Sequence, residues 1–204
     1  METRERILQA SHELLYKFGV RSVTMDDIAK EIGISKKTIY TCFSDKNELV
    51  TQFMQDKLNE HQQSFEYIIQ TSANAIDEIF KSMHEMGHVF SRINPNFIYD
   101  IQKHHPSAWQ LFKNFKDKHV EGMIERNLKK GILEGLYRTD INIKIISKMR
   151  LENMEMGFNP MIFSPEDYNI REVQMQLLNH FLHGITTLKG HKLINKYKEI
   201  TDEE

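Results

Sequence analysis

The sequence predicts an all-α protein, and three observations support this prediction. Only four prolines and nine glycines occur among 204 residues, so few positions interrupt a helix. Apolar side chains recur mostly every three or four residues, which is the spacing of one helix face. With 40% apolar and 27% charged residues, the chain can bury a core. We expect about nine helices, divided between a small N-terminal domain of residues 1–48 and a larger helical domain of residues 49–204.

Composition also limits the class of protein. No run approaches the roughly 18 consecutive apolar residues that a membrane span requires, and the first residues do not form a signal peptide, so we expect a cytoplasmic protein with no membrane partner. The single cysteine, Cys42, can form neither an intrachain disulfide nor a thiolate zinc cage. The net charge of −2 means that any contact with nucleic acid must depend on a local basic patch.

The first two predicted helices have clear start or stop signals. Apolar residues on one face predict a helix over residues 3–18, and Gly19 ends it. Thr24 then precedes a second helix. Its hydroxyl can accept from the backbone N–H three residues on, while Asp27 can reach back to the Thr24 N–H, which makes a capping box.

A third short helix follows after a tight turn. Gly33 tolerates the positive φ that such a turn requires, and Ser35 can cap a helix running from residue 36 to about 43. Ile39 and Phe43 anchor that helix inward. Two short helices joined by a glycine-containing turn form a helix-turn-helix, which places its second helix in the major groove of double-stranded DNA.

The outward face of the third helix carries side chains that can donate to phosphates or base edges, namely Lys36, Lys37, Thr38, Tyr40 and Thr41. No acidic residue interrupts this stretch. A second capping box at residues 45–48 holds Lys46 in the first turn of a fourth helix, where its ammonium could meet a phosphate. The alternative interpretation of these lysines is an ordinary solvated surface.

The segment from Thr24 to Leu49, TMDDIAKEIGISKKTIYTCFSDKNEL, closely resembles the DNA-binding segment of the tetracycline-repressor (TetR) family, and the resemblance covers roughly residues 4–55. It implies a homodimeric regulator, usually a repressor, that binds a roughly palindromic operator and releases it when a small molecule enters the C-terminal domain. Such a protein is not an enzyme and needs no cofactor.

The resemblance also implies roles for single residues. Thr24, Tyr40 and Lys46 would hold phosphates, whereas Lys36, Lys37, Thr38 and Thr41 would lie at or near base edges. Two positions depart from the common pattern of the family. Lys37 stands where a small residue is frequent, and Cys42 stands where an aromatic residue or histidine is often found, which leaves the operator sequence open. We interpret Cys42 as a small packing residue rather than a redox sensor.

The rest of the chain predicts further helices. The fourth helix continues through residue 49 to about residue 70. Further helices are expected at 73–92, in a short segment after Asn94-Pro95, from His105-Pro106 to the glycines at 131 and 135, at 140–158, and from a start at Ser164-Pro165. The last two resemble the dimerisation helices of the family, and their apolar residues suit a bundle of two subunits or core packing within one chain. The interface residues expected are Met149, Met156, Met175, Leu178, Phe181, Leu182 and Ile185.

The sequence His84-Glu85-Met86-Gly87-His88 matches H-E-x-x-H, in which two histidines bind zinc and a glutamate activates water. Short matches of this kind also arise by chance. A zinc peptidase and a metal-responsive regulator are therefore the alternative functions, and we expect no bound metal. A helical protein that keeps the shape of the DNA-binding domain but binds another protein is a further alternative.

The central helices resemble the pocket walls of the family. The side chains expected to contact a small, apolar or aromatic effector are His84, His88, Phe90, Trp109, Phe112, Phe115 and Met123. An aromatic stripe at helical spacing is more often plain core, and this alternative stays open for each residue.

Overall fold

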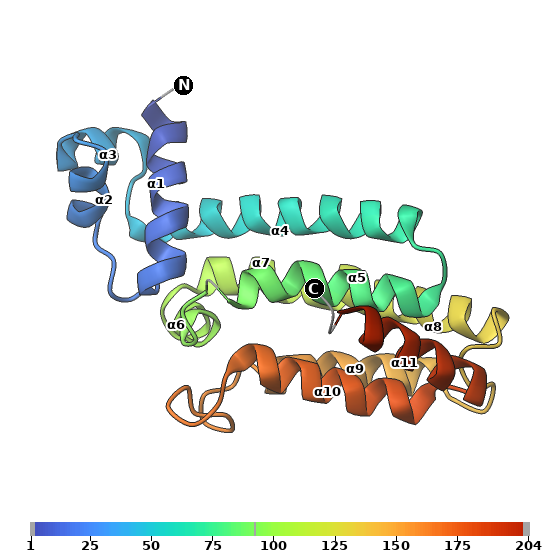
Figure 1. Cartoon of the computed structure of the whole chain (residues 1–204). Helices are drawn as coiled ribbons and strands as arrows, with labels where there is room; N and C mark the ends of the chain where they lie inside the picture. The colour runs from blue at the N-terminus through green and yellow to red at the C-terminus, as the bar shows by residue number, and fades with distance from the viewer. Residues whose placement is uncertain (1–2, 92, 202–204) are drawn as a thin grey trace. The chain divides into compact units, whose positions relative to one another are not determined.

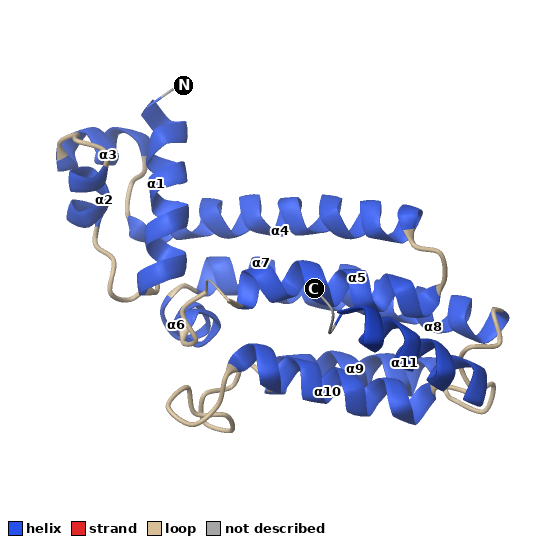
Figure 2. Cartoon of the chain, in the orientation of Figure 1, coloured by secondary structure: helices blue, strands red, loops and turns tan. Residues whose placement is uncertain are grey.

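The computed structural model describes residues 3–91 and 93–201, without the side chains of residues 90 and 199–201. Throughout this part of the chain the fold is helical, as predicted, and helices are joined by loops with no strand between them (Figure 2). The residues group into two compact units. Unit 1 comprises the described residues of Met1–His61 and Arg92–Phe115, and unit 2 those of Gln62–Ser91 and Lys116–Glu204. The division predicted after residue 48 is one of function and stays a prediction.

Unit 1 contains the N-terminal helices and a later pair. Its helices are α1 (Thr3–Phe18), α2 (Met25–Glu31), α3 (Lys36–Cys42), the first part of α4 (Lys46–Thr71), α6 (Phe97–His104) and α7 (Pro106–Phe115), labelled in Figure 1. One apolar core joins them, and it contains the fully buried side chains of Ile7, Leu15, Ile28, Ile39 and Phe53. The short helices α2 and α3 are thus held by packing, because helices of seven residues are unstable alone.

Unit 2 is built from longer helices. It contains the rest of α4, then α5 (Ala75–Phe90), a π-helical segment η1 (Lys116–Val120), α8 (Glu121–Leu133), α9 (Ile143–Met156), α10 (Ile170–Ile185) and α11 (Leu188–Thr201). Its core contains Ile76, Leu128, Leu182 and Ile194, each at most 1% exposed. The hydroxyl of buried Tyr137 donates to Asn127 Oδ1 at 3.0 Å, and Asn127 Nδ2 donates to the carbonyl of Ala75 at 2.9 Å. This chain of hydrogen bonds joins α5, α8 and the loop after α8.

The structure differs from the sequence prediction in two places among the later helices. The long helix expected after His105-Pro106 is helical throughout residues 106–133, but residues 116–120 within it are π-helical and separate α7 from α8. The helix expected to start at Ser164-Pro165 starts at Ile170 instead, because Asn169 Oδ1 accepts from the N–H groups of Arg171 and Glu172 at 2.9 and 3.2 Å. Ser164 starts only an isolated turn, in which its carbonyl accepts from the N–H of Tyr168 at 2.9 Å.

None of the described helices combines the length and the apolar character that crossing a bilayer requires.

Candidate nucleic-acid interface

The start of α2 is fixed by the predicted capping box. Thr24 Oγ1 accepts from the N–H of Asp27 at 3.2 Å, and a carboxylate oxygen of Asp27 accepts from the backbone N–H of Thr24 at 2.8 Å and from its hydroxyl at 2.6 Å. These bonds to Thr24 lower the pKa of Asp27. The Thr24 side chain is exposed, but its hydroxyl is engaged with Asp27. A phosphate contact by Thr24 must therefore share or replace that bond.

The turn between α2 and α3 depends on Gly33. Its φ is +67°, in the left-handed region that glycine adopts without strain. A Cβ at this position would meet nothing within 4 Å, so the requirement for glycine comes from the backbone alone. The N–H of Ile34 donates to the carbonyl of Ala29 at 3.0 Å, which closes the C-terminus of α2.

Helix α3 buries one side and exposes the other. Ser35 caps it, since its Oγ accepts from the N–H of Thr38 at 3.1 Å. Ile39 is fully buried, and Phe43, which directly follows the helix, is 1% exposed. The opposite side presents the predicted DNA-binding residues of this helix, of which Lys36, Lys37, Tyr40 and Thr41 are exposed and Thr38 is half-buried. The structure therefore brings these five side chains together on one helix.

The side chains of α3 differ in how far they are already engaged. Lys36 Nζ lies 2.9 Å from Asp26 Oδ2, and this contact raises the pKa of Lys36. The hydroxyl of Thr41 donates to the carbonyl of Thr38 at 2.7 Å. In the part of the chain that the structure describes, Lys37 has no ion-pair partner, and Tyr40 is 45% exposed. Lys37 and Tyr40 are thus the most available donors.

The ammonium of Lys46 is bonded within the chain instead of standing free for a phosphate. Lys46 begins α4, as predicted. The backbone N–H of Glu48 donates to Asp45 Oδ1 at 2.8 Å. The Glu48 carboxylate, however, accepts from the backbone N–H of Ser44. The ammonium of Lys46 donates to the backbone carbonyl of Val20 at 2.5 Å and is half-buried. Burial lowers its pKa, which Asp100 and Asp27 partly offset. Phosphate binding by Lys46 would require that the bond to Val20 break.

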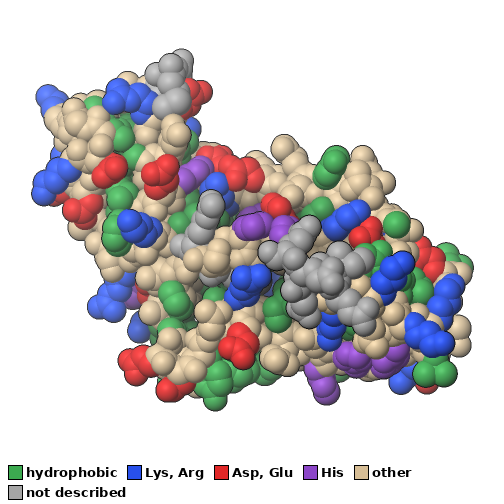
Figure 3. Space-filling model, viewed as in Figure 1, with side chains coloured by type: hydrophobic (Ala, Val, Ile, Leu, Met, Phe, Trp, Pro, Cys, Tyr) green, Lys and Arg blue, Asp and Glu red, His purple; other side chains and the backbone are tan. Residues whose placement is uncertain are grey.

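Arg4 also belongs to this surface, although no local sequence pattern indicates it. Its guanidinium lies 4.8 Å from the ring centroid of Phe43, directly after α3, and Nη2 donates to Gln52 Oε1 at 3.2 Å. Arg4 therefore adds an exposed cation beside the end of α3. Sequence spacing does not indicate this position, because Arg4 precedes α3 by some thirty residues and reaches its end only in the folded chain. Figure 3 shows Lys and Arg side chains on the surface of the N-terminal helices, with acidic side chains among them.

The predicted effector residues fall in both units. In unit 1, Trp109 and Phe112 stack with ring centroids 5.4 Å apart, and together with Phe115 they pack half-buried against the apolar core. In unit 2, His84 and His88 are exposed on α5 and Met123 is half-buried on α8. The side chain of Phe90 lies outside the described residues. For the three aromatic residues of unit 1, the contacts are those of ordinary core packing.

The two histidines of the H-E-x-x-H match lie together on α5. Their Nε2 atoms are 3.2 Å apart, and the rings meet edge to face. Among the described residues, no group of three His, Cys, Asp or Glu side chains has the arrangement of metal ligands. A third ligand for this pair is therefore not provided by that part of the chain.

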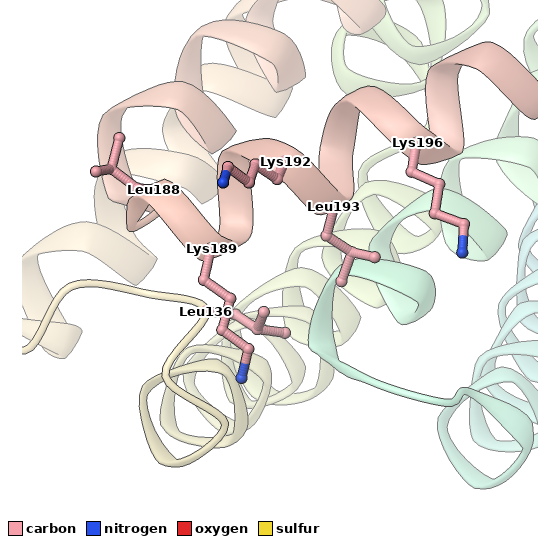
Figure 4. A pocket seen from close by; sticks show the side chains of 6 residues that line it. All are labelled: Leu136, Leu188, Lys189, Lys192, Leu193 and Lys196. Atoms are coloured by element: carbon pink, nitrogen blue, oxygen red, sulfur yellow. The ribbon is translucent and has the colours of Figure 1, made fainter.

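A shallow pocket of about 500 Å³ lies along α11 and involves none of the predicted effector residues. Figure 4 shows the side chains that line it, which are Leu136, Leu188, Lys189, Lys192, Leu193 and Lys196. Three lysines beside an apolar floor make this surface attractive for anions.

Four of the residues expected in the dimer interface are buried within the chain's own core. Leu178, Phe181, Leu182 and Ile185 on α10 are each at most 4% exposed.

The other expected interface residues are more accessible. Met156 and Met175 are half-buried, whereas Met149 is 45% exposed, and the nearby Ile145 is 64% exposed. Among the residues expected in the interface, the exposed apolar surface thus lies on α9, while the four α10 residues pack in the core of the chain itself.

The comparison with known proteins agrees with this geometry. Residues 7–53, from α1 through α3 into α4, match the family model described as bacterial regulatory proteins, tetR family. The chain is also 23% identical over 183 residues to the uncharacterized HTH-type transcriptional regulator YvaF of Bacillus subtilis, which covers 89% of this chain and 95% of that protein.

The N-terminal segment is of the tetR type, and the matches together support a transcriptional regulator of the TetR family. Its helix-turn-helix is therefore a DNA-binding element. The HTH-type transcriptional regulator SAB2452 of Staphylococcus aureus is 38% identical over 68 residues, and this match covers 33% of our chain and 37% of that protein.

Solved structures extend the similarity beyond the helix-turn-helix. A TetR-family regulator from Marinobacter aquaeolei has a TM-score of 0.74 at 18% identity, over 98% of both chains. A putative transcriptional regulator from Saccharomonospora viridis, solved in complex with choline, has a TM-score of 0.70 at 16% identity and covers 90% of this chain and 97% of that one. At these identities the likeness shows a shared fold.

Proposed function

We propose that this TetR-family regulator is a ligand-responsive repressor in the cytoplasm, which binds a palindromic operator as a homodimer. The observation that carries the proposal is the outward face of α3, where Lys37, Tyr40 and Thr41 are exposed while Ile39 is fully buried. This arrangement leaves the donors of the helix available for a major groove.

The phosphate and base contacts follow from the same surface. Lys36, Lys37, Thr38 and Thr41 lie at or near base edges, and Tyr40 binds a phosphate. Lys36 must first leave Asp26, which costs little because both side chains are half-exposed and the pair is screened by water. Thr24 and Lys46 are the weaker candidates for phosphate contacts, since both are engaged within unit 1.

Repression ends when a small apolar or aromatic effector binds. The choline complex of a regulator with the same fold supports a ligand site in this architecture. Binding favours a conformation in which the separation of the two DNA-binding domains no longer matches two grooves about 34 Å apart. Only a ligand with different affinities for the two conformations can have this effect.

Selection from a random pool of duplexes tests the proposal. The purified full chain should enrich one sequence, arranged as two inverted half-sites about one helical turn apart. Enrichment of a single, unrepeated half-site would contradict the homodimer. The absence of any preferred duplex would contradict sequence-specific repression and favour the alternative of a protein that binds another protein.

The metal-responsive alternative rests on the 3.2 Å between Nε2 of His84 and Nε2 of His88, which suits two ligands of one tetrahedral zinc ion. Dialysed protein analysed for zinc distinguishes it from the main proposal. Stoichiometric metal that is lost in His84→Ala would establish a metal site, and a metal-free wild type would exclude a tightly bound one.

A further inference from the structure

Arg150 on α9 is a buried cation with no ion-pair partner in the described part of the chain. The residue is 5% exposed, and its Nη1 is fully buried with no hydrogen-bond partner. Its guanidinium carbon lies 5.4 Å from the ring centroid of Phe181 on α10. A guanidinium has five N–H donors, and an aromatic face satisfies none of them as a hydrogen-bond acceptor does.

The acidic residues of the same helix do not compensate this charge. Glu152 lies 3.1 Å from Lys148 Nζ, and Glu155 is bonded to Lys116. Burial alone lowers the pKa of Arg150, to about 10, with no carboxylate opposing the change. At neutral pH the side chain is still charged, so the free protein carries an uncompensated buried cation, which is unfavourable.

Other polar side chains are buried on the same helix pair. Ser147 lies one turn before Arg150 and is fully buried, with its hydroxyl donating to the carbonyl of Lys144 at 3.1 Å. Gln174 on α10 is 1% exposed and donates to the carbonyl of Met154 at 2.9 Å. Both of these side chains have backbone partners, so among the three polar residues buried on the α9–α10 pair it is Arg150 that has a buried donor left unpaired.

We infer that Arg150 receives the anionic group of the effector, and that this effector is a small carboxylate with an apolar body. The inference rests on the proposed function and specifies its ligand. A planar carboxylate can accept two parallel N–H bonds from a guanidinium, and the ring of Phe181 beside Arg150 provides apolar surface for the body. Half-buried Met154, on the next turn of α9, has a flexible side chain that can yield room.

Ligand binding by the full chain tests the inference directly. Decanoate and 4-phenylbutyrate serve as probes, each compared with the corresponding neutral alcohol. The carboxylates should raise the melting temperature of the wild type and release DNA, and the alcohols should act much more weakly. In Arg150→Met, the affinity for the carboxylates should fall about tenfold or more, while binding to DNA in the absence of a probe is unchanged. No preference of the wild type for the carboxylates over the alcohols would overturn the inference.

The stability of the ligand-free protein provides a second test that needs no probe. Because Arg150→Met removes an uncompensated charge and keeps the apolar stem, the variant should melt at a higher temperature than the wild type. A lower melting temperature, or failure to fold, would mean that the guanidinium has an internal partner and would overturn the inference.

The lysines of α11 provide the matched control. If the carboxylates instead bind at the α11 pocket, their effect will persist in Arg150→Met and disappear in Lys192→Gln or Lys196→Gln, which would also overturn the inference. Failure of the proposed function is distinguishable, because it would appear as loss of DNA selection in the wild type without any probe.

Discussion

Lysines of equal charge have different surroundings in unit 1, and these determine what each can do. Lys37 is exposed and has no ion-pair partner in the described residues, Lys36 faces Asp26, and Lys46 donates to the backbone of Val20. A cation that is already engaged must leave its partner before it binds DNA. We therefore expect the DNA contacts of unit 1 to depend most strongly on Lys37.

Lys46 should act mainly on stability. Lys46→Met removes the charge-assisted bond to the Val20 carbonyl, so the free energy of unfolding should fall by about 1.5 kcal/mol, as measured by urea denaturation. The dependence of DNA binding on salt should change little. A slope flattened by about 0.9 per DNA-binding domain, with stability unchanged, would instead establish the phosphate contact first expected for Lys46.

Two histidines of unit 1 should make stability depend on pH. Burial lowers the pKa of His12 and of His105 from 6.5, and His105 Nδ1 also lies 2.5 Å from Asn47 Oδ1. The folded state favours the neutral rings, so the unfolded state binds more protons as the pH falls. Their contribution to stability is present in full above about pH 6.5 and is lost as the pH falls below it.

Thermal melting across this range measures the effect. The wild type should melt at progressively lower temperature as the pH falls below about 6.5, and His12→Gln with His105→Gln should show a flatter dependence. His183→Gln is the control, because His183 is exposed and lies in unit 2, and this variant should keep a dependence nearly as steep as that of the wild type. An equally steep dependence in the double variant would contradict this assignment.

At the scale of the element, the turn between α2 and α3 should depend on its glycine. Gly33→Ala places a Cβ at φ +67° and should destabilise the protein by about 1–2 kcal/mol. Gly122→Ala is the matched control, since Gly122 lies in α8 with equally open space around it, and should stabilise by up to about 1 kcal/mol. Equal effects of the two substitutions would contradict the conformational argument.

The elements that could be predicted from the sequence are those with local signals. The cap at Thr24, the positive φ of Gly33 and the cap at Ser35 all depend on residues close in sequence, and the structure has each of them. The same signals failed at Ser164, where the expected cap forms an isolated turn and Asn169 caps the helix. Local capping signals there competed, and the sequence alone did not decide between them.

The properties of the site that depend on tertiary contacts could not be predicted. The ammonium of Lys46 meets a carbonyl 26 positions earlier, and Arg4 lies beside the end of α3 only because α1 packs there. Likewise, the apolar spacing of α10 fits a partner helix in the same chain or in another. Phe181 is buried within the one chain, and only the packing of the folded chain shows this. Periodicity gives the apolar face of a helix but not its neighbour.

At the scale of the whole molecule, the proposed homodimer should depend on the exposed apolar residues of α9. Ile145 is 64% exposed and Met149 45%. Light scattering should give the wild type about twice the chain mass of 24.2 kDa, and Ile145→Glu should shift it toward the single chain, because a charge in an apolar interface is costly.

Leu188→Glu on α11 is the control for this measurement. Leu188 is 83% exposed, so its substitution introduces the same charge at another exposed apolar position. A dimer that tolerates Ile145→Glu but not Leu188→Glu would move the interface to α11.

The central claim is that the outward face of α3 reads DNA, and competition binding to the selected duplex tests it most directly. Lys37→Ala should weaken binding by about 1–3 kcal/mol and relax the preference at one base pair of each half-site. Lys113→Ala, at another exposed lysine of unit 1, should change neither. Equal affinity and unchanged base preference for Lys37→Ala and the wild type would contradict the account.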